Sequence, residues 1–460
     1  MATDEGIGVR DGSMTEVCLT GKSSMAPLEV KPNEDARLLR NRNFIRICIG
    51  SAIAMLGSQF TALALPWLVL KMTGDPVALA TVMVISGAPQ IVLLLFGGGL
   101  VDKYSPKRIL TWSYVSCAIL LLGLSGLLFM GRLELWMIDV FAFSTGLVFG
   151  ISVPASFSSI AAALPKSMVP AASSVIGSIR QAAAFVGPLL AGVLLGISVG
   201  ESTATGVAHT APDMSTFAIA FLIDGLGLAL VALIMLQVAF RPVSSDTAKT
   251  GSRLNIIPAV KWFLADRQAL TVLCYWMLVS FVLSGPVRIA LPLLAEQSTE
   301  LGAQAYGLLV SANSAGVFLG MTALGLLRAV ISKQMWSLVL LLDAIASCLL
   351  VAIGAVHPEL NFALFLYIGL LVLVGTRTGF VEIAWFSWLQ QRYPDEIRGR
   401  ATSVFMVVST INISASVALS GWMSRQMPAK EIFLLAGAAT LLVVTVSALL
   451  KIFGVLKIDG

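Results

Sequence analysis

The sequence has 460 residues, of which 57% are hydrophobic and only 12% are charged, and its formal net charge is +5. The composition excludes the soluble globular classes, because this number of charged residues could not cover the surface of a soluble protein of this length. The small positive excess is spread over short loops and does not indicate a nucleic-acid partner. The five cysteines are scattered and only two histidines are present, so we expect neither a disulfide framework nor a metal site.

Residues 1–36 are polar and contain no early apolar core, which predicts a disordered cytoplasmic tail rather than a signal peptide. Gly21-Lys22-Ser23 matches the end of a phosphate-binding loop, but Glu16 stands where that motif has its first glycine. Because the sequence offers no nucleotide, metal or nucleophile constellation, we expect no cofactor and no enzymatic activity.

The rest of the chain predicts an all-α membrane protein with twelve transmembrane helices. The polar stretch 240–268 predicts a cytoplasmic linker between an N-terminal six-helix bundle at 37–239 and a C-terminal one at 269–455. The apolar segments are expected at 44–70, 77–101, 109–131, 135–160, 171–198, 215–238, 269–295, 305–328, 336–356, 361–389, 401–424 and 430–453.

The charges of the connecting segments predict the orientation. With a cytoplasmic N-terminus, most Lys and Arg residues of the loops lie inside, and the outside loops hold only Lys71, Arg132, Arg425 and Lys430. The positive-inside rule therefore predicts that both termini are cytoplasmic. We expect His209 and His357 on the opposite face.

Short patterns recur between the two halves. Ala64-Leu65-Pro66 in the first span returns as Ala290-Leu291-Pro292 in the seventh, and Gly99-Leu100 returns as Gly325-Leu326. These repeats predict two pseudo-symmetric six-helix bundles with a substrate held between them.

The loop between the second and third spans reads Gly98-Gly99-Leu100-Val101-Asp102-Lys103-Tyr104-Ser105-Pro106-Lys107-Arg108. It resembles the signature of major facilitator transporters, although Ser105 and Pro106 depart from it. In that family, such a loop holds the cytoplasmic side shut, so the resemblance implies a gating role here together with the basic residues before span 11. The residues that carry this expectation are Gly98, Asp102, Lys103, Lys107, Arg108, Arg398 and Arg400.

Four further segments are informative: Leu56-Gly57-Ser58-Gln59-Phe60, Thr73-Gly74-Asp75-Pro76, Val153-Pro154-Ala155 and Gln390-Gln391-Arg392-Tyr393-Pro394. They resemble the drug:proton antiporter branch that includes macrolide-efflux and enterobactin-exporter-like proteins. This resemblance implies export from the cytoplasm. Many relatives carry an acid where Ser58 stands, so a proton carrier has to be sought among the other intramembrane acids.

Ionisable groups inside a bilayer are costly and are candidates for function. We expect proton coupling by Glu382 first, with Asp224 and Asp343 as alternatives. Asp139 lies near the outer end of its span. The candidates for the wall of a substrate cavity are Gln59, Arg180, Arg288, Asn313 and Arg377.

Gly187, Pro188 and Gly192 in the fifth span permit a helix bend and a close helix approach. A related Gly-Pro pattern in drug antiporters is associated with export. Close packing alone explains these residues equally well.

The leading hypothesis is a monomeric secondary exporter of amphipathic organic compounds in the plasma (inner) membrane, driven by proton antiport. Its partners would be a small-molecule substrate, protons and membrane lipids. One alternative is an exporter of an anionic, siderophore-like metabolite bound by arginines. An alternative from another class is a lipid flippase.

Overall fold

A computed structural model describes residues 40–204, 214–240, 266–298, 302–331, 335–356, 362–393 and 395–450. Within these ranges it leaves the side chains of 95–103, 197–204, 326–331, 395–400 and a few single residues undescribed. The tail 1–36, His209, His357 and most of the linker 240–268 lie outside the described residues, so the predictions about them stay predictions.

The described chain is all helical, and twelve of its helical segments are long and apolar enough to cross a membrane. The predicted fold class is therefore confirmed. The helices are α2 (Arg42–Thr73), α3 (Pro76–Tyr104), α4 (Pro106–Phe129), α5 (Leu135–Ala163), the short η1 (Lys166–Met168), α6 (Val169–Ala204), α7 (Met214–Leu236), α10 (Arg267–Gly285), η2 (Pro286–Ala290), α11 (Leu291–Ser298), α12 (Ala303–Ile331), α13 (Met335–Ala355), α14 (Ala363–Arg392), α15 (Asp395–Met423) and α16 (Ala429–Leu449).

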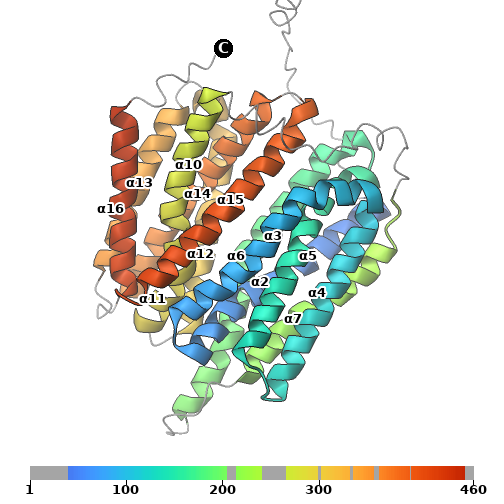
Figure 1. The fold of residues 1–460 in the computed structure, drawn as a ribbon, viewed down its shortest axis with the longest axis horizontal. Coiled ribbons are helices and arrows are strands. Elements are labelled where there is room, and N and C mark those ends of the chain that lie inside the picture. The colour runs from blue at the N-terminus through green and yellow to red at the C-terminus, as the bar shows by residue number, and fades with distance from the viewer. Residues whose placement is uncertain are drawn as a thin grey trace, which may run out of the picture.

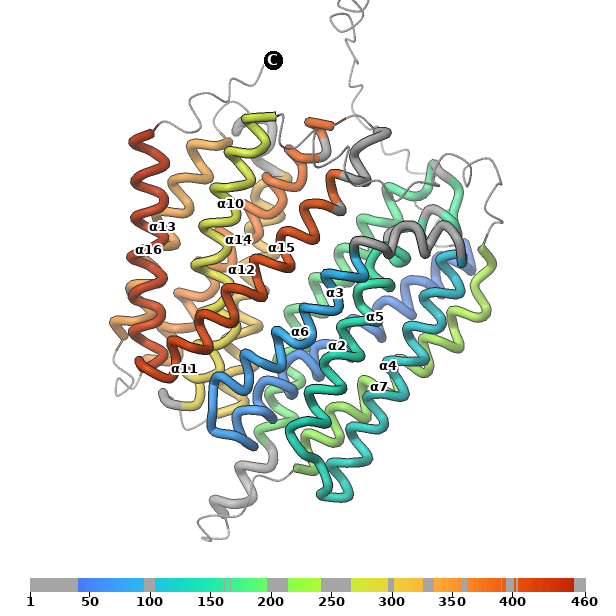
Figure 2. Tube along the Cα trace, viewed as in Figure 1, coloured from blue at the N-terminus to red at the C-terminus, as the bar shows by residue number. Residues whose placement is uncertain are grey.

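Two groups of six spans lie side by side (Figure 1). We call α2–α7 the N half and α10–α16 the C half. The strongest packing across them joins α6 to α12 and α3 to α15. Figure 2 shows α3 and α15 running along the boundary between the halves. We call the end where α2 begins and α16 ends the tail end, and the opposite end the far end.

Local sequence signals explain where several helices start and stop. Gly74 ends α2 in the left-handed conformation with φ of 62°, and the Asp75 carboxylate accepts from the Val77 N–H at 2.9 Å to cap α3. Pro76 then occupies the first position of α3, where its missing N–H has no cost. At the tail end, Asn41 caps α2 and Asp266 caps α10.

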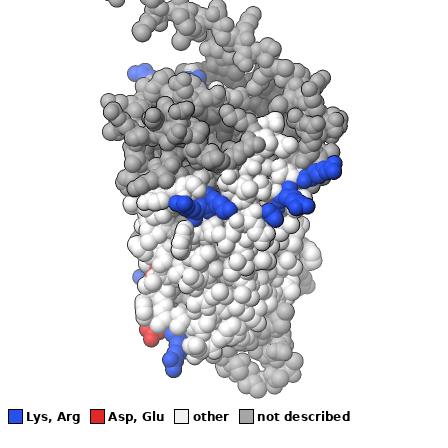
Figure 3. All heavy atoms as spheres, turned by 90° about the vertical axis from the view of Figure 1, so that its right-hand side faces the viewer, with Lys and Arg blue, Asp and Glu red and all other residues white. Residues whose placement is uncertain are grey.

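The outer surface of the N half is largely uncharged. Figure 3 shows a broad surface without Lys, Arg, Asp or Glu between basic residues near one end and charged residues near the other. Such a band matches the hydrocarbon region of a bilayer, where charged side chains are costly.

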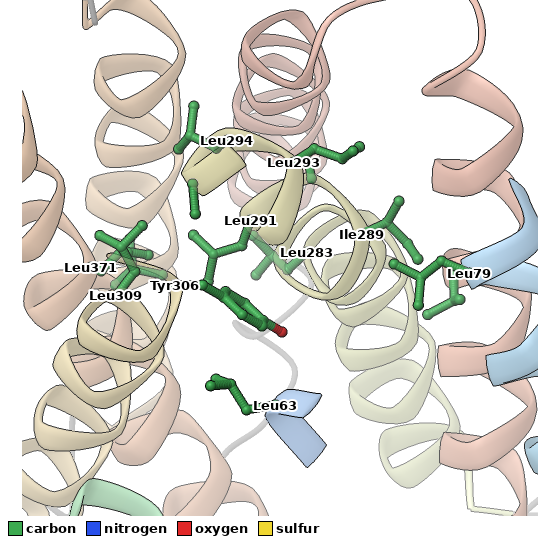
Figure 4. Packing of buried hydrophobic residues seen from close by; sticks show 14 of the residues in the cluster. Leu63, Leu79, Leu283, Ile289, Leu291, Leu293, Leu294, Tyr306, Leu309 and Leu371 are labelled. Atoms are coloured by element: carbon green, nitrogen blue, oxygen red, sulfur yellow. The ribbon is translucent and has the colours of Figure 1, made fainter. Parts of the chain in front are cut away.

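Buried apolar residues from both halves belong to one continuous cluster, which also extends through the interior of the C half toward the tail end. Ile289 of η2 lies beside Leu79 of α3, and Leu63 of α2 faces the region of Tyr306 from α12 (Figure 4). The halves are therefore held together at this level by close apolar packing.

Candidate functional site

A cavity of about 460 Å³ lies between the two halves. Most of its wall is apolar, with small polar side chains placed at intervals. A volume of this order and a mostly apolar wall are typical of sites for small organic ligands. The residues of its wall are Thr61, Ala62, Leu65, Pro66, Val82, Met83, Ser86, Gly87, Gln90, Ala142, Thr145, Phe149, Arg288, Thr410, Ile413, Ser414 and Val417.

Arg288 supplies the cavity's charge. Among the described residues of the wall, it is the only Lys, Arg, Asp or Glu. Its side chain remains exposed because it borders the open space. The cavity therefore presents one cation surrounded by neutral donors and acceptors, which suits a ligand with an anionic or hydrogen-bond-accepting group.

Arg288 lies in a short π-helical segment, η2, and the sequence alone predicted an uninterrupted seventh span there. The cause lies just before it. The Gly285 N–H donates to Ser416 Oγ of α15 at 2.7 Å, and that hydroxyl donates to the Phe281 carbonyl oxygen. The Ser416 side chain thus inserts between backbone hydrogen-bonding groups of the helix, and Pro286 contributes no N–H to the helix. Such bulges are frequent at functional sites.

The far end is closed by contacts between the halves. The rings of Trp67 and Tyr306 stack with their centroids 5.9 Å apart. Lys71 Nζ lies 2.8 Å from Glu296 Oε1. Both contacts join α2 of the N half to the C half near the far end, so they hold the halves together there.

A second far-end ion pair joins two loops. Arg425 Nη2 lies 2.5 Å from Asp75 Oδ2. The hydrogen bond from Arg425 holds the pKa of Asp75 below its usual range, and the Val77 N–H adds to this effect. The carboxylate that caps α3 therefore also contacts the C half.

Gly187 and Gly192 of α6 serve close packing. A methyl group on Gly187 would lie 2.4 Å from Gln59 Cβ of α2. A methyl group on Gly192 would lie 2.9 Å from the Cα of Gly307 on α12, in the other half. Gly192 thus lies at a close contact between the backbones of α6 and α12, and α6 is continuous through Pro188.

Asp224 of α7 is buried against α2, with 3% of its surface exposed. Its Oδ2 lies 2.5 Å from the Thr61 hydroxyl oxygen. Its Oδ1 has no hydrogen-bond partner among the described residues. Thr61 also belongs to the cavity wall, so it lies between the buried carboxyl group and the cavity.

Asp343 and Arg377 form a buried ion pair between α13 and α14. Arg377 Nε donates to Asp343 Oδ1, and the Tyr275 hydroxyl donates to Oδ2. Asp343 is fully buried and Arg377 is 9% exposed. Trp276 and Trp385, whose ring centroids are 6.3 Å apart, lie at the same site. This pair belongs to the interior of the C half rather than to the central cavity.

Glu382 of α14 is exposed and interacts electrostatically with Arg180 of α6. These two groups belong to different halves. Next to Arg180, the Gln181 amide donates to the Ser314 carbonyl oxygen of α12 at 3.0 Å. Glu382 therefore lies at the boundary between the halves, as an acid that senses their separation would.

The signature loop is described in part. Lys107 Nζ donates to the carbonyl oxygens of Leu236 and Val238 at 2.8 and 2.7 Å, which caps the end of α7. Arg108 is exposed. The other expected gating side chains lie outside the described residues, and their role stays a prediction; they are Asp102, Lys103, Arg398 and Arg400.

Of the five expected cavity residues, Arg288 lies on the wall of the described cavity. Gln59 packs against Gly187, and the Asn313 carbonyl oxygen lies against Gly375. Sequence reasoning missed Thr61, Ser86, Gln90, Thr145, Thr410 and Ser414. Small polar residues also occur at helix contacts throughout apolar spans, so the sequence carried no signal that separates these six.

A family model described as Major Facilitator Superfamily matches residues 47–417. The chain belongs to this superfamily. Its members are transporters, so the chain is an integral multi-pass transport protein. No curated protein matches it.

Solved structures show the same fold at low sequence identity. The nucleoside transporter NupG has a TM-score of 0.67 at 13% identity, with 90% of this chain and 99% of that chain covered. An inward-facing bacterial homologue of the iron transporter ferroportin has a TM-score of 0.63 at 15% identity, covering 90% and 99%. The inward-open xylose transporter XylE from E. coli has a TM-score of 0.62 at 12% identity, covering 90% and 96%.

Proposed function

We propose that this major facilitator protein is a secondary active exporter of amphipathic organic compounds that works by alternating access and proton antiport. The observation that carries the proposal is the cavity between the halves, with its long apolar wall and few polar groups. Apolar surface binds the hydrophobic part of a ligand, and the scattered polar groups fix its orientation. The far-end contacts close one of the two routes to this cavity, as alternating access requires.

A narrower cargo, an amphipathic organic anion of siderophore-like chemistry, is favoured by one observation. Arg288 is the cation of the described cavity wall, and no acid on that wall neutralises it. An arginine in such a position pairs with a carboxylate or another anionic group of the substrate. A cationic cargo would instead meet repulsion.

Proton antiport requires a group whose protonation differs between the two access states. Among the expected carriers, Asp343 is paired with Arg377 inside the C half. Glu382 and Asp224 are better placed, because Glu382 lies at the boundary between the halves and Asp224 contacts the cavity wall through Thr61. The substitutions Glu382→Gln and Asp224→Asn test these two carriers, because each removes the titratable proton and retains the shape of the side chain.

The function is tested with purified protein in liposomes. Carboxyfluorescein and ethidium serve as an anionic and a cationic amphipathic probe, and an imposed pH gradient drives transport. We expect uphill movement of the anionic dye, coupled to proton flux and reduced in Arg288→Gln. Equal behaviour of Arg288→Gln and wild type would reject the anionic cargo. Movement of fluorescent lipid without movement of either dye would identify a flippase.

The proposed orientation places the tail end in the cytoplasm. In a cysteine-free background, Arg132→Cys in the far-end turn should react with an impermeant maleimide added to intact cells. Gln237→Cys at the tail-end terminus of α7 should react only after the membrane is broken. The opposite pattern would invert the topology and with it the direction of transport.

A further inference from the structure

Asp224 differs from the other acids of the membrane-spanning helices in its surroundings. Asp343 receives hydrogen bonds from Arg377 and Tyr275, and Glu382 interacts with Arg180. Asp224 has the Thr61 hydroxyl as its polar contact, and one of its oxygens has no donor among the described residues. Burial of an ionised carboxylate under these conditions is expensive.

The helices packed around Asp224 do not provide a compensating charge. From α2, the residues facing it are Gly57 and Thr61, and a methyl group on Gly57 would lie 2.6 Å from Asp224 Oδ1. From α4, the titratable group that interacts with it is the Cys117 thiol. The charged residue in the described part of α6, Arg180, interacts with Glu382 instead. The Thr61 hydroxyl donates to Asp224 Oδ2, 2.5 Å away. The neutral, protonated carboxyl group also fits this site, because a hydroxyl group can equally accept a hydrogen bond from a protonated Oδ2.

Thr61 connects this site to the cavity. It is half buried, belongs to the cavity wall and contacts Asp224 from α2. A hydroxyl group both accepts and donates a hydrogen bond. It can therefore accept the Asp224 proton while its own hydrogen leaves to an acceptor in the cavity, and the reverse exchange reloads the carboxylate.

We propose that Asp224 binds the transported proton and that Thr61 relays it between this carboxyl group and the substrate cavity. The inference rests on the proposed proton antiport and names the group that performs it. In each relay step the O–H bond at Asp224 Oδ2 breaks and a new O–H bond forms at Thr61 Oγ1, while the original Thr61 O–H bond breaks and its proton passes to a water molecule or a substrate oxygen in the cavity. Because a substrate in the cavity covers Thr61, proton and substrate compete for the same wall, which is the relation that antiport requires.

The first experiment needs no substrate. Infrared difference spectra of the purified protein are recorded while the pH is stepped, and the C=O stretch of a protonated carboxyl group is followed. We expect a titrating band that Asp224→Asn removes and Glu382→Gln retains. Thr61→Val should shift this band, because it deletes the hydrogen bond, whereas Thr61→Ser should leave it in place.

Thr410→Val is the matched control. Thr410 lies on the same cavity wall from α15, and its hydroxyl donates to the Met406 carbonyl oxygen of its own helix at 2.8 Å. The same chemical change there should leave the band unmoved. A titrating band that is lost in Glu382→Gln and kept in Asp224→Asn would overturn the proposal, and so would a band indifferent to both Thr61 variants.

The second experiment measures dye-coupled proton flux in liposomes. Thr61→Val should reduce it by about tenfold or more, while Thr61→Ser retains it. Absence of dye transport in the wild type would count against the proposed function alone, because the infrared titration still decides the role of Asp224. Wild-type coupling in Thr61→Val would reject the relay.

Discussion

Three intramembrane arginines with the same charge take three different environments in the structure. Arg288 faces the cavity, Arg377 is buried against Asp343, and Arg180 lies at the boundary between the halves near Glu382. The sequence predicted a functional or structural role for each, because a charged side chain inside a bilayer is costly unless it is paired or hydrated. It could not assign partners, since Arg377 and Asp343 belong to separate spans and only packing of α13 against α14 brings them together.

Asp343→Asn should lower the stability of the C half sharply. The substitution leaves the Arg377 charge buried without its counterion, which typically costs about 3–5 kcal/mol. The measurement is thermal or denaturant unfolding in detergent. Arg392→Gln serves as the control, because its pair with Asp266 is more exposed and such pairs contribute less than about 1 kcal/mol.

The double variant Asp343→Leu with Arg377→Met separates stability from transport. Apolar residues of similar volume often replace a buried ion pair without loss, so we expect most of the stability to return. Loss of proton coupling in a stable double variant would instead give this pair a part in the transport cycle and contradict its assignment to the C-half interior.

At the scale of helices, small residues determine how closely the halves approach. The sequence predicted that Gly187, Pro188 and Gly192 would permit a bend or a close approach. The structure shows that Gly187 packs within the N half and that Gly192 packs against Gly307 of the C half. The pairing of Gly192 could not be predicted, because its partner follows in the other bundle and depends on the far end being closed.

Gly192→Ala should hinder closure of the far end. The added methyl group would meet the Gly307 Cα at 2.9 Å and the Ala303 carbonyl oxygen at 3.2 Å, both backbone atoms that cannot move aside alone. Spin labels at Arg132→Cys in the N half and Glu431→Cys in the C half report the far-end distance. We expect a shift of the distance distribution toward longer values.

Gly177→Ala on the same helix is the control for this substitution. A methyl group there meets nothing within 4 Å, while it changes helix propensity by the same amount, about 1 kcal/mol. An identical distance distribution in the two variants would show that the contact between Gly192 and Gly307 does not limit closure.

For the whole molecule, the twelve spans and the all-helical fold followed from hydrophobicity, because the bilayer forces every backbone group into local hydrogen bonds. The π-helical break before Arg288 did not follow, since it depends on Ser416 reaching Gly285 from another helix. The cavity wall was equally hidden: its polar residues come from five separate elements, and only Arg288 was conspicuous in the sequence. The helical break and the cavity wall both depend on contacts between residues far apart in the chain, so the sequence alone could not predict them.

The far-end closure has a defined response to pH through Asp75. Arg425 lowers the pKa of this carboxyl group in the closed state, below the ordinary value of 3.8. When a conformational state lowers the pKa of a carboxyl group, the ionised group stabilises that state. This stabilisation is fully present at pH values above the ordinary pKa, and it is lost as the pH falls through the lowered pKa. Between about pH 5 and about pH 8, the pair with Arg425 should therefore stabilise closure by a constant amount.

Asp75→Asn tests this directly, because asparagine still caps α3 but removes the ion pair. The distance between labels at positions 132 and 431 should lengthen in this variant by the same amount at each pH across that window. Any pH dependence of the wild-type distance should survive in Asp75→Asn and disappear in Asp224→Asn, since the far-end pair stays ionised while the buried carboxyl group exchanges its proton. If Asp75→Asn alone abolished the pH dependence, the far-end loops rather than the membrane interior would sense protons.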